Sequence, residues 1–304
     1  MKKIAISIGD LNGVGIEIVL KSHVEISKLC HPIYCINKEL LDQAAKLLNV
    51  SVPKDFILEN VSGSFTIVPG NVSKKSGRYS YDSFMSAISL CETKNVDAIV
   101  TMPIHKEAWM KSGLEYKGHT DLLRQHFNAD AIMMLGCPQM FVALVTEHIP
   151  LREVTKTIKY KMLKQFLLDL QKSIPQEKVA VLGINPHAGD NGVLGHEDMR
   201  IKKAIKSVNK QLGYEQFIGP LVPDVAFTPH VRKNFNYFVA MYHDQGLTPL
   251  KALHFDESVN ISLNLPIIRT SVDHGTAFDI AYKGEAKTLS YINAVKSALS
   301  FINK

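Results

Sequence analysis

Three apolar runs of this chain each end in a histidine, at His148, His187 and His243. Short runs rich in valine, isoleucine, phenylalanine and tyrosine are typical of buried strands, and open α/β sheets bind ligands at the carboxyl ends of their strands. The three imidazoles are therefore expected to converge on one point. Three protein ligands with coordination positions left open describe a catalytic metal site, where the ion acts as a Lewis acid on a substrate oxygen.

A second interpretation stays open for each of these histidines. A single histidine at a strand end is commonly a boundary residue whose ring is satisfied by local hydrogen bonds. The three lie far apart in the sequence and do not form the compact HExxH signature of a zinc-binding helix. Their spacing alone therefore leaves a shared metal undecided.

Other polar residues stand where they could bind an anionic substrate. His119 and Thr120 are expected near the N-terminus of a helix, where unsatisfied N–H groups favour negative charge, although Thr120 could simply cap that helix. Arg269 suits a phosphate or carboxylate by its bidentate geometry, and Lys251 suits one as a point charge. Asn260 lies in the apolar region between them. Each charged residue could also be an ordinary surface group.

Two glycine-containing segments, 9–15 and 185–192, are candidates for loops that bind a ligand. The glycines of the first fit neither the GxGxxG nor the GxxxxGK[ST] phosphate-binding pattern, so we expect a turn where the backbone passes close to something. The second segment holds His187 beside a proline and is followed by small residues. That composition leaves room for a ligand, which favours a binding loop over a plain surface loop.

Strand and helix patterns alternate along the whole length of the chain. Alternation of this kind predicts an α/β fold with a mainly parallel sheet and helices on both faces. The clearest helix is 197–212, followed by Gly213 as a stop signal, and Asp273–Thr276 is expected to open another helix. The expected strands are 3–8, 32–36, 65–68, 98–102, 131–134, 141–146, 179–184, 238–241 and 259–263.

Length and composition narrow the class of protein. At 304 residues the chain exceeds the size of one hydrophobic core, so we expect one catalytic unit over 1–304 built of two α/β lobes with a cleft between them. The net charge of +6 is spread along the sequence, which argues against a nucleic-acid partner. The four cysteines form no CxxC pair, and no run reaches the roughly 20 apolar residues of a membrane span. A cytoplasmic protein without a membrane partner is the expectation.

Seven short segments occur in a fixed order along the chain: 9–15 (GDLNGVG), 102–106 (MPIHK), 118–120 (GHT), 146–152 (TEHIPLR), 185–189 (NPHAG), 242–247 (YHDQGL) and 269–276 (RTSVDHGT). Taken together, they resemble the 4-hydroxythreonine-4-phosphate dehydrogenase family of vitamin B6 biosynthesis. Leu11 and Ile16 stand where that family usually carries proline, and the chain is shorter than many members between 51 and 79.

The resemblance implies a fold, an assembly and a set of site residues. It implies the two-lobed α/β/α fold of isocitrate and isopropylmalate dehydrogenases. It also implies a homodimer whose active site lies at the subunit interface, with metal ligands drawn from both chains. The family's metal ligands fall on His148, His187 and His243, with one divalent ion, zinc, cobalt or magnesium, per subunit. Its substrate-binding residues fall on His119, Thr120, Lys251, Asn260 and Arg269.

The resemblance also implies a reaction. Family members oxidise the 3-hydroxyl of 4-phosphooxy-L-threonine, a small phosphorylated hydroxy-amino acid, with NAD or NADP, and the product loses CO₂ to give 3-amino-2-oxopropyl phosphate. Asp224, Asp244 and Lys251 are candidates for the catalytic base, without a ranking, and no cofactor-binding residue is assigned. Alternatives are a related dehydrogenase of threonate or erythronate 4-phosphate and, from another class, a metal-dependent hydrolase.

Overall fold

The structure, a computed structural model, describes residues 1–302 and forms two compact units. The first unit contains 1–129, 259–261 and the chain from Leu265 onward. The second contains 130–258 and 262–264. Each unit is thus discontinuous in sequence, because the chain leaves the first unit after residue 129 and returns to it only at 259.

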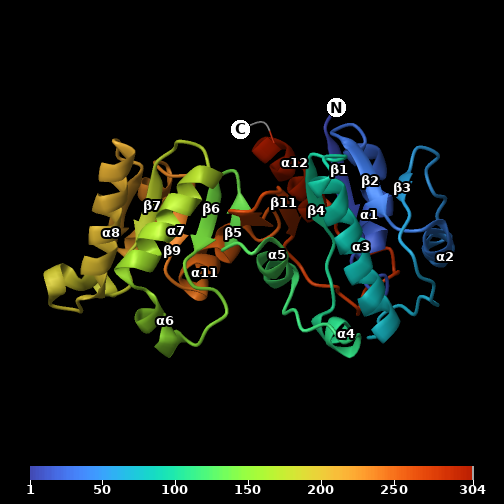
Figure 1. Cartoon of the computed structure of the whole chain (residues 1–304), viewed down its shortest axis with the longest axis horizontal. Helices are drawn as coiled ribbons and strands as arrows, with labels where there is room; N and C mark the ends of the chain where they lie inside the picture. Colours follow the sequence, from blue (N-terminus) through green and yellow to red (C-terminus); the bar gives the residue numbers. More distant parts are fainter. Residues whose placement is uncertain (303–304) are drawn as a thin grey trace. The chain divides into compact units, whose positions relative to one another are not determined.

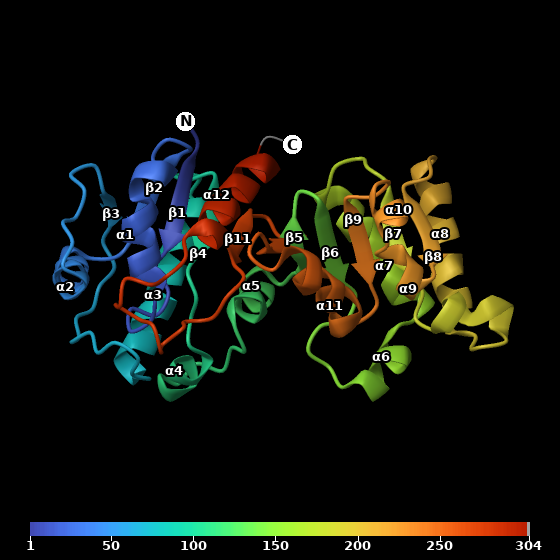
Figure 2. The ribbon, with the colours of Figure 1, turned by 180° about the vertical axis from the view of Figure 1, so that it is seen from behind.

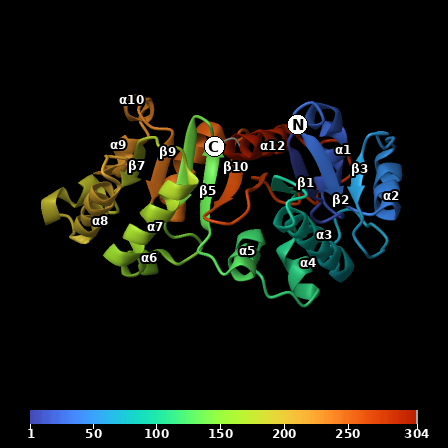
Figure 3. The same ribbon diagram turned by 45° about the horizontal axis from the view of Figure 1, so that its top comes forward.

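The first unit is a doubly wound α/β layer structure. Its parallel sheet has the order β3-β2-β1-β4-β11, and β10 (Val259–Leu263) follows β11. Figure 3 shows β3, β2 and β1 side by side. Helix α3 covers one face, whereas α1 and α12 pack against each other on the opposite face (Figures 1 and 2). The bounds are β1 Lys3–Ser7, β2 His31–Cys35, β3 Ile57–Glu59, β4 Ala98–Thr101, β11 Arg269–Val272, α1 Gly15–Ile26, α2 Lys38–Leu48, α3 Lys74–Glu92, α4 Lys106–Lys111, α5 His119–Phe127 and α12 Leu289–Ile302.

The second unit has the sheet order β5-β6-β9-β7-β8. Strands β5 and β6 form an antiparallel hairpin, and the remaining neighbours pair in parallel. Helices α7 and α8 pack together on one face, and α11 covers β6 and β9 from the other (Figures 1 and 2). The bounds are β5 Ile132–Cys137, β6 Met140–Leu144, β7 Val179–Leu182, β8 Phe217–Leu221, β9 Tyr237–Ala240, α6 Leu151–Thr157, α7 Tyr160–Ser173, η1 Pro186–Gly192, α8 Glu197–Leu212, α9 Pro223–Ala226, α10 Pro229–Arg232 and α11 His243–His254.

Burial explains why these segments form strands. Parallel strands covered on both faces read as continuous apolar runs, and Ile4, Ala5 and Ile6 of β1 are fully buried. In the second unit, alternate residues of β6 join Leu247 and Leu250 of α11 in one apolar cluster. Each buried leucine of this kind contributes about 1.5–3 kcal/mol relative to exposure, so the cluster anchors α11 to the sheet.

The predicted α/β class is confirmed, but two local predictions are wrong. Residues 65–68 are not a strand, because their backbone donors are used elsewhere: the N–H of Ile67 donates to Gln43 Oε1, and that of Val68 to Asn12 Oδ1. Residues 273–276 do not open a helix; the N–H of Asp273 donates to Ser290 Oγ, and helix α12 begins only at Leu289. Apolar composition in 65–68 reflects burial without strand pairing.

Three strands were missed, the short β3 together with β8 and β11, and one pairing differs from the parallel expectation. Strand β8 has the sequence Phe-Ile-Gly-Pro-Leu, and β11 has the sequence Arg-Thr-Ser-Val. Their glycine, proline and polar residues interrupt the apolar pattern by which strands are predicted. Strand β5 is antiparallel to β6 because only a tight turn separates them. Helix α8 has the predicted bounds and ends at Gly213, whose φ of 80° is the left-handed conformation expected of a C-terminal glycine.

Within residues 1–302 we find no helix whose length and hydrophobicity would let it span a membrane.

Candidate active site

The strands that lead to the three predicted metal ligands are neighbours in the second unit. Strand β9 pairs in parallel with β6 on one side and with β7 on the other. The carboxyl ends of parallel neighbours lie at one edge of a sheet. His148 follows β6, His187 follows β7 within η1, and His243 is the first residue of α11 after β9. All three histidines therefore leave the same edge of the sheet.

Two of these imidazoles lie close together. The ring centroids of His148 and His243 are 5.5 Å apart, with the planes tilted by 45°. Two imidazoles that bind one tetrahedral ion have centroids about 5 Å apart, given nitrogen–metal distances of about 2 Å. Asp244 Oδ1 lies 2.7 Å from His243 Nδ1, the kind of carboxylate contact that orients a ligating ring. This donor pair fits a divalent ion.

A complete set of three donors is not found in one copy of the chain. Among residues 1–302, no group of three histidine, cysteine, aspartate or glutamate side chains is close enough to hold a metal ion. The structure thus brings His148 and His243 together, and assignment of His187 to the same ion stays a prediction.

The loop that carries His187 has an unusual backbone. Residues 187–191 all have φ between 41° and 79°, a left-handed conformation that costs energy for side chains other than glycine. Buried Asp198 of α8 holds the start of this loop: its carboxylate accepts from the N–H groups of Ile184 at 2.8 Å and Asn185 at 3.2 Å. An aspartate at the first turn of α8 thereby fixes the strand end from which His187 departs.

The first unit contains a buried cationic site. Arg269 of β11 is 2% exposed, and its Nε and Nη2 donate to Thr101 Oγ1 of β4 at 3.2 and 2.7 Å. Burial lowers the pKa of Arg269 to about 9, which means that the protein desolvates a positive charge here. Such a charge is costly unless a partner offsets it, and a bound phosphate or carboxylate would do so.

His119 completes this site from the N-terminus of α5. Its ring packs edge-on against Phe84 and Trp109, with centroids at 4.7 and 5.7 Å. Its buried Nε2 has no hydrogen-bond partner among the described residues. Burial, and next the positive charge of Arg269, hold the pKa of His119 well below its usual range, so the ring is neutral. Gly118 rather than Thr120 is the N-cap, and Thr120 lies in the first turn, 8% exposed.

The neutral state of His119 predicts a pH dependence of stability. Below a pH of about 6.5 the unfolded chain binds a proton on this histidine that the folded chain does not bind, so the free energy of unfolding falls as pH falls. About one pH unit below that value, this group alone costs about 1.4 kcal/mol. Urea unfolding of wild type and His119→Gln from neutral to mildly acidic pH measures it: the wild type should lose more stability than the variant. Equal losses would contradict a neutral His119.

The glycines at 9–15 serve packing within the first unit. A Cβ on Gly9 would lie 2.3 Å from the carbonyl oxygen of Pro103, and one on Gly13 would lie 2.7 Å from that of Thr276. Asp10 and Asn12 are fully buried, and burial raises the pKa of Asp10. The expected close approach is therefore to the chain's own backbone.

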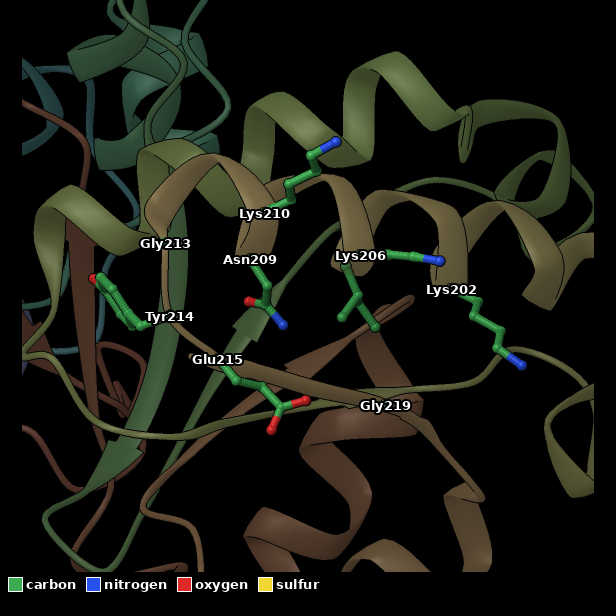
Figure 4. Close-up of a pocket in the computed structure, with 9 residues that line it drawn as sticks. Lys202, Lys206, Asn209, Lys210, Gly213, Tyr214, Glu215 and Gly219 are labelled. Atoms are coloured by element: carbon green, nitrogen blue, oxygen red, sulfur yellow. The ribbon is translucent and has the colours of Figure 1, made fainter.

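A surface pocket in the second unit lies apart from the predicted residues. It is lined by residues of α8 and the segment leading to β8, and its volume is about 520 Å³. Figure 4 shows Lys202, Lys206 and Lys210 spaced along α8 above it. None of the predicted metal-binding, substrate-binding or catalytic residues lines this pocket.

A family model described as "Pyridoxal phosphate biosynthetic protein PdxA" matches residues 28–298. The chain belongs to this family. A relative of Sulfurimonas denitrificans named 4-hydroxythreonine-4-phosphate dehydrogenase is 70% identical over 298 residues, which cover 98% of this chain and 97% of the relative. The solved structure of a protein of the same name from Klebsiella pneumoniae is 32% identical, covers 99% of this chain and 100% of its own, and has a TM-score of 0.85.

Membership of the PdxA family confirms the resemblance inferred from the sequence, that to a dehydrogenase family of pyridoxal phosphate biosynthesis. The fold is also similar to that of a β-decarboxylating dehydrogenase from Thermococcus kodakarensis, with a TM-score of 0.52 at 13% identity over 100% of this chain and 84% of that one. At that identity the likeness concerns the fold alone. It agrees with the predicted isocitrate dehydrogenase-like architecture.

The remaining predicted residues of this PdxA-family chain occupy three elements. Lys251 lies on α11, with its Nζ 5.2 Å from the centroid of the Phe255 ring, and Asn260 lies on β10 with a buried Oδ1. Asp244 contacts His243, whereas Asp224 is exposed on the short helix α9. No contact of Asp224, Asp244 or Lys251 selects one of them as the base.

Sequence reasoning missed Thr101 as part of the PdxA-family site. It is fully buried at the end of β4, where its hydroxyl accepts hydrogen bonds from Nε and Nη2 of Arg269. The available signal was a hydroxyl residue that closes an otherwise apolar strand directly before Met-Pro. That signal is weak, because buried threonines commonly bond to nearby backbone.

Proposed function

We propose that this chain oxidises the 3-hydroxyl of 4-phosphooxy-L-threonine with NAD or NADP, and that the keto acid then loses CO₂ to give 3-amino-2-oxopropyl phosphate. Family membership supports the reaction class. The observation that carries the proposal is the convergence of three histidine-bearing strand ends on one edge of the second unit. The buried cationic site of the first unit supplies a place for the substrate's phosphate.

A divalent ion would be held by His148, His187 and His243. When bound, such an ion polarises a substrate hydroxyl and lowers its pKa. Imidazole donors suit zinc or cobalt, and substrate oxygens in the remaining positions would make magnesium workable.

The chain's own residues then perform binding and proton transfer. Arg269 pairs with the phosphate through its guanidinium, and neutral His119 adds an uncharged hydrogen-bonding nitrogen. Oxidation moves a hydride from C3 to the nicotinamide and a proton from the hydroxyl to a base, for which Asp224, Asp244 and Lys251 are the candidates. The resulting carbonyl stands β to the carboxylate, so the bond to CO₂ breaks with its electron pair delocalised onto that carbonyl. The enolate then takes up a proton at C2 to give the amino ketone. Lys251 and Asn260 are assigned to substrate binding.

We propose a homodimer that completes the metal site. Exposed large apolar side chains follow two of the ligands within six residues of sequence: Leu151, after His148, and Val193, after His187, are 68% and 79% exposed. Apolar surface of this kind beside a functional site is typical of protein interfaces. Since no three such donors gather within residues 1–302 of one copy, a second copy that covers these side chains would bring the remaining donor.

The test is a steady-state assay that follows nicotinamide absorbance. Metal-free protein should be inactive on 4-phosphooxy-L-threonine, and zinc, cobalt or magnesium should restore turnover. NAD and NADP are compared side by side, and sedimentation of the active fraction should show a dimer. Turnover of threonate or erythronate 4-phosphate without turnover of the amino substrate would refute the proposed substrate. Phosphate release without nicotinamide reduction would refute the dehydrogenase chemistry.

Thr101→Val should weaken substrate binding more than turnover. The variant keeps the shape of the side chain but removes the acceptor of two Arg269 hydrogen bonds, so the guanidinium is held less firmly in place. Hydrogen bonds to charged groups contribute about 1.5–3 kcal/mol, which predicts a KM about tenfold higher with kcat changed little. Thr101→Ser retains the hydroxyl and should restore the wild-type KM. Equal behaviour of the two variants would show that the hydroxyl does not orient Arg269.

A further inference from the structure

Side-chain hydrogen bonds join the three loops that follow β6, β9 and β7. Thr146 Oγ1, after β6, donates to the carbonyl oxygen of Met241, after β9, at 2.7 Å. Gln245 Nε2, in the first turn of α11, donates to the carbonyl oxygen of Gly183, after β7, at 2.6 Å. We call the side chains of Thr146 and Gln245 the brace. It links the three strand ends from which the histidines depart.

Gln245 uses both ends of its amide. Its Oε1 accepts from the N–H of Met241 at 2.7 Å while its Nε2 reaches the neighbouring loop. Only an amide side chain offers a donor and an acceptor at these two places; a methionine of similar length offers neither. Gln245 is half-buried and Thr146 is 5% exposed, so lost bonds there are poorly replaced by water.

Each end of the brace lies near one predicted ligand. Thr146 is two residues before His148, and Gln245 is two residues after His243. Gly183 begins the segment that Asp198 holds through Ile184 and Asn185, directly before the His187 loop. Helix α11 is packed tightly on β6, since a Cβ on Gly246 would lie 2.5 Å from Val142 Cγ1. A change in the brace therefore moves loops rather than the sheet beneath them.

We propose that Thr146 and Gln245 are positioning residues that hold the histidine-bearing loops of each copy in place and thereby set the affinity for the divalent ion. This inference rests on the proposed metal site of His148, His187 and His243. Residues that orient metal ligands without touching the metal typically change metal affinity by about 10–100-fold when replaced. Neither Thr146 nor Gln245 is proposed to contact the substrate or the metal. A substitution at either position therefore acts on metal affinity through the histidines.

The experiment measures cobalt binding by the full-length chain after metal removal. Calorimetric titration gives the affinity, and the visible absorption of bound Co²⁺ reports its coordination geometry. Gln245→Met and Thr146→Val should each lower the affinity about tenfold or more and alter the spectrum. Gln171→Met is the matched control, because Gln171 Nε2 bonds only to the hydroxyl of Tyr214, at 3.3 Å in the same unit. The control should bind cobalt as the wild type does.

The outcomes separate the brace from the metal site itself. Wild-type affinity and spectrum in both brace variants would overturn the inference and leave the proposed function standing. Failure of the wild type to bind cobalt would overturn the metal site and the brace with it. Circular dichroism and thermal unfolding check each fold, and if Gln245→Met does not fold, the Thr146→Val result decides.

Discussion

Replacing His243 by alanine is expected to lower kcat/KM for 4-phosphooxy-L-threonine by on the order of a thousandfold, equivalent to about 4 kcal/mol. His243 is the first residue of α11, and its ring lies 5.5 Å from that of His148. If either ring is lost, only one of the two neighbouring imidazoles remains. A single imidazole of this pair cannot hold the ion that polarises the substrate hydroxyl. Steady-state kinetics with added cobalt or zinc measure the loss.

His230→Ala provides the control for this prediction. His230 is exposed on α10 of the same unit and is not among the predicted ligands, so its removal should leave kcat/KM unchanged. Excess metal should restore part of the activity of His243→Ala if weak binding is the cause. A fully active, metal-replete His243→Ala protein would remove His243 from the site.

Arg269→Met should raise KM for the phosphorylated substrate about a hundredfold, equivalent to about 2.7 kcal/mol. The guanidinium is 2% exposed and burial lowers its pKa, so it is a desolvated cation whose favourable partner is an anion. Inorganic phosphate should accordingly raise the melting temperature of the wild type and have no such effect on the variant. Both the KM and the phosphate-induced shift are to be measured.

The fold of Arg269→Met should survive, because an apolar side chain of similar length replaces a buried charge, an exchange that is often neutral or stabilising. Arg269→Lys keeps the charge but loses the planar fork and should recover only part of the affinity. Arg78→Met is the control: Arg78 forms an exposed ion pair with Asp82 in the same unit, and such pairs contribute little. A wild-type KM in Arg269→Met would mean that the phosphate binds elsewhere.

Local patterns in the sequence identified much of the fold and of the candidate site. The apolar runs before His148, His187 and His243 are β6, β7 and β9, and helix 197–212 has the bounds expected from its period and its terminal glycine. These elements could be predicted from the sequence because a strand that is buried on both faces carries mostly apolar side chains. A helix that is buried on one side carries an apolar stripe. The family resemblance could also be recognised from the sequence, because the segments that carry it are short and contiguous.

Where a local pattern misled, the competing cause was tertiary. Residues 65–68 are apolar because Phe65 and Ile67 are buried, yet their backbone bonds to side chains of distant segments. Strand β11 is polar because it carries Arg269 into a buried site. At Gly9 and Gly13 the predicted close backbone approach is found, and the tertiary structure shows that it is to the chain's own residues 103 and 276.

The sequence by itself determined which residues could do chemistry and at which strand ends they stand, because residue type and hydrophobic period are local properties. Only the tertiary structure decided that β9 lies between β6 and β7, that Gln245 reaches Gly183, and that Thr101 holds Arg269 across 168 positions of sequence. Sheet order and long-range side-chain bonds follow from how whole elements bury their surfaces against one another. No local run of residues encodes them.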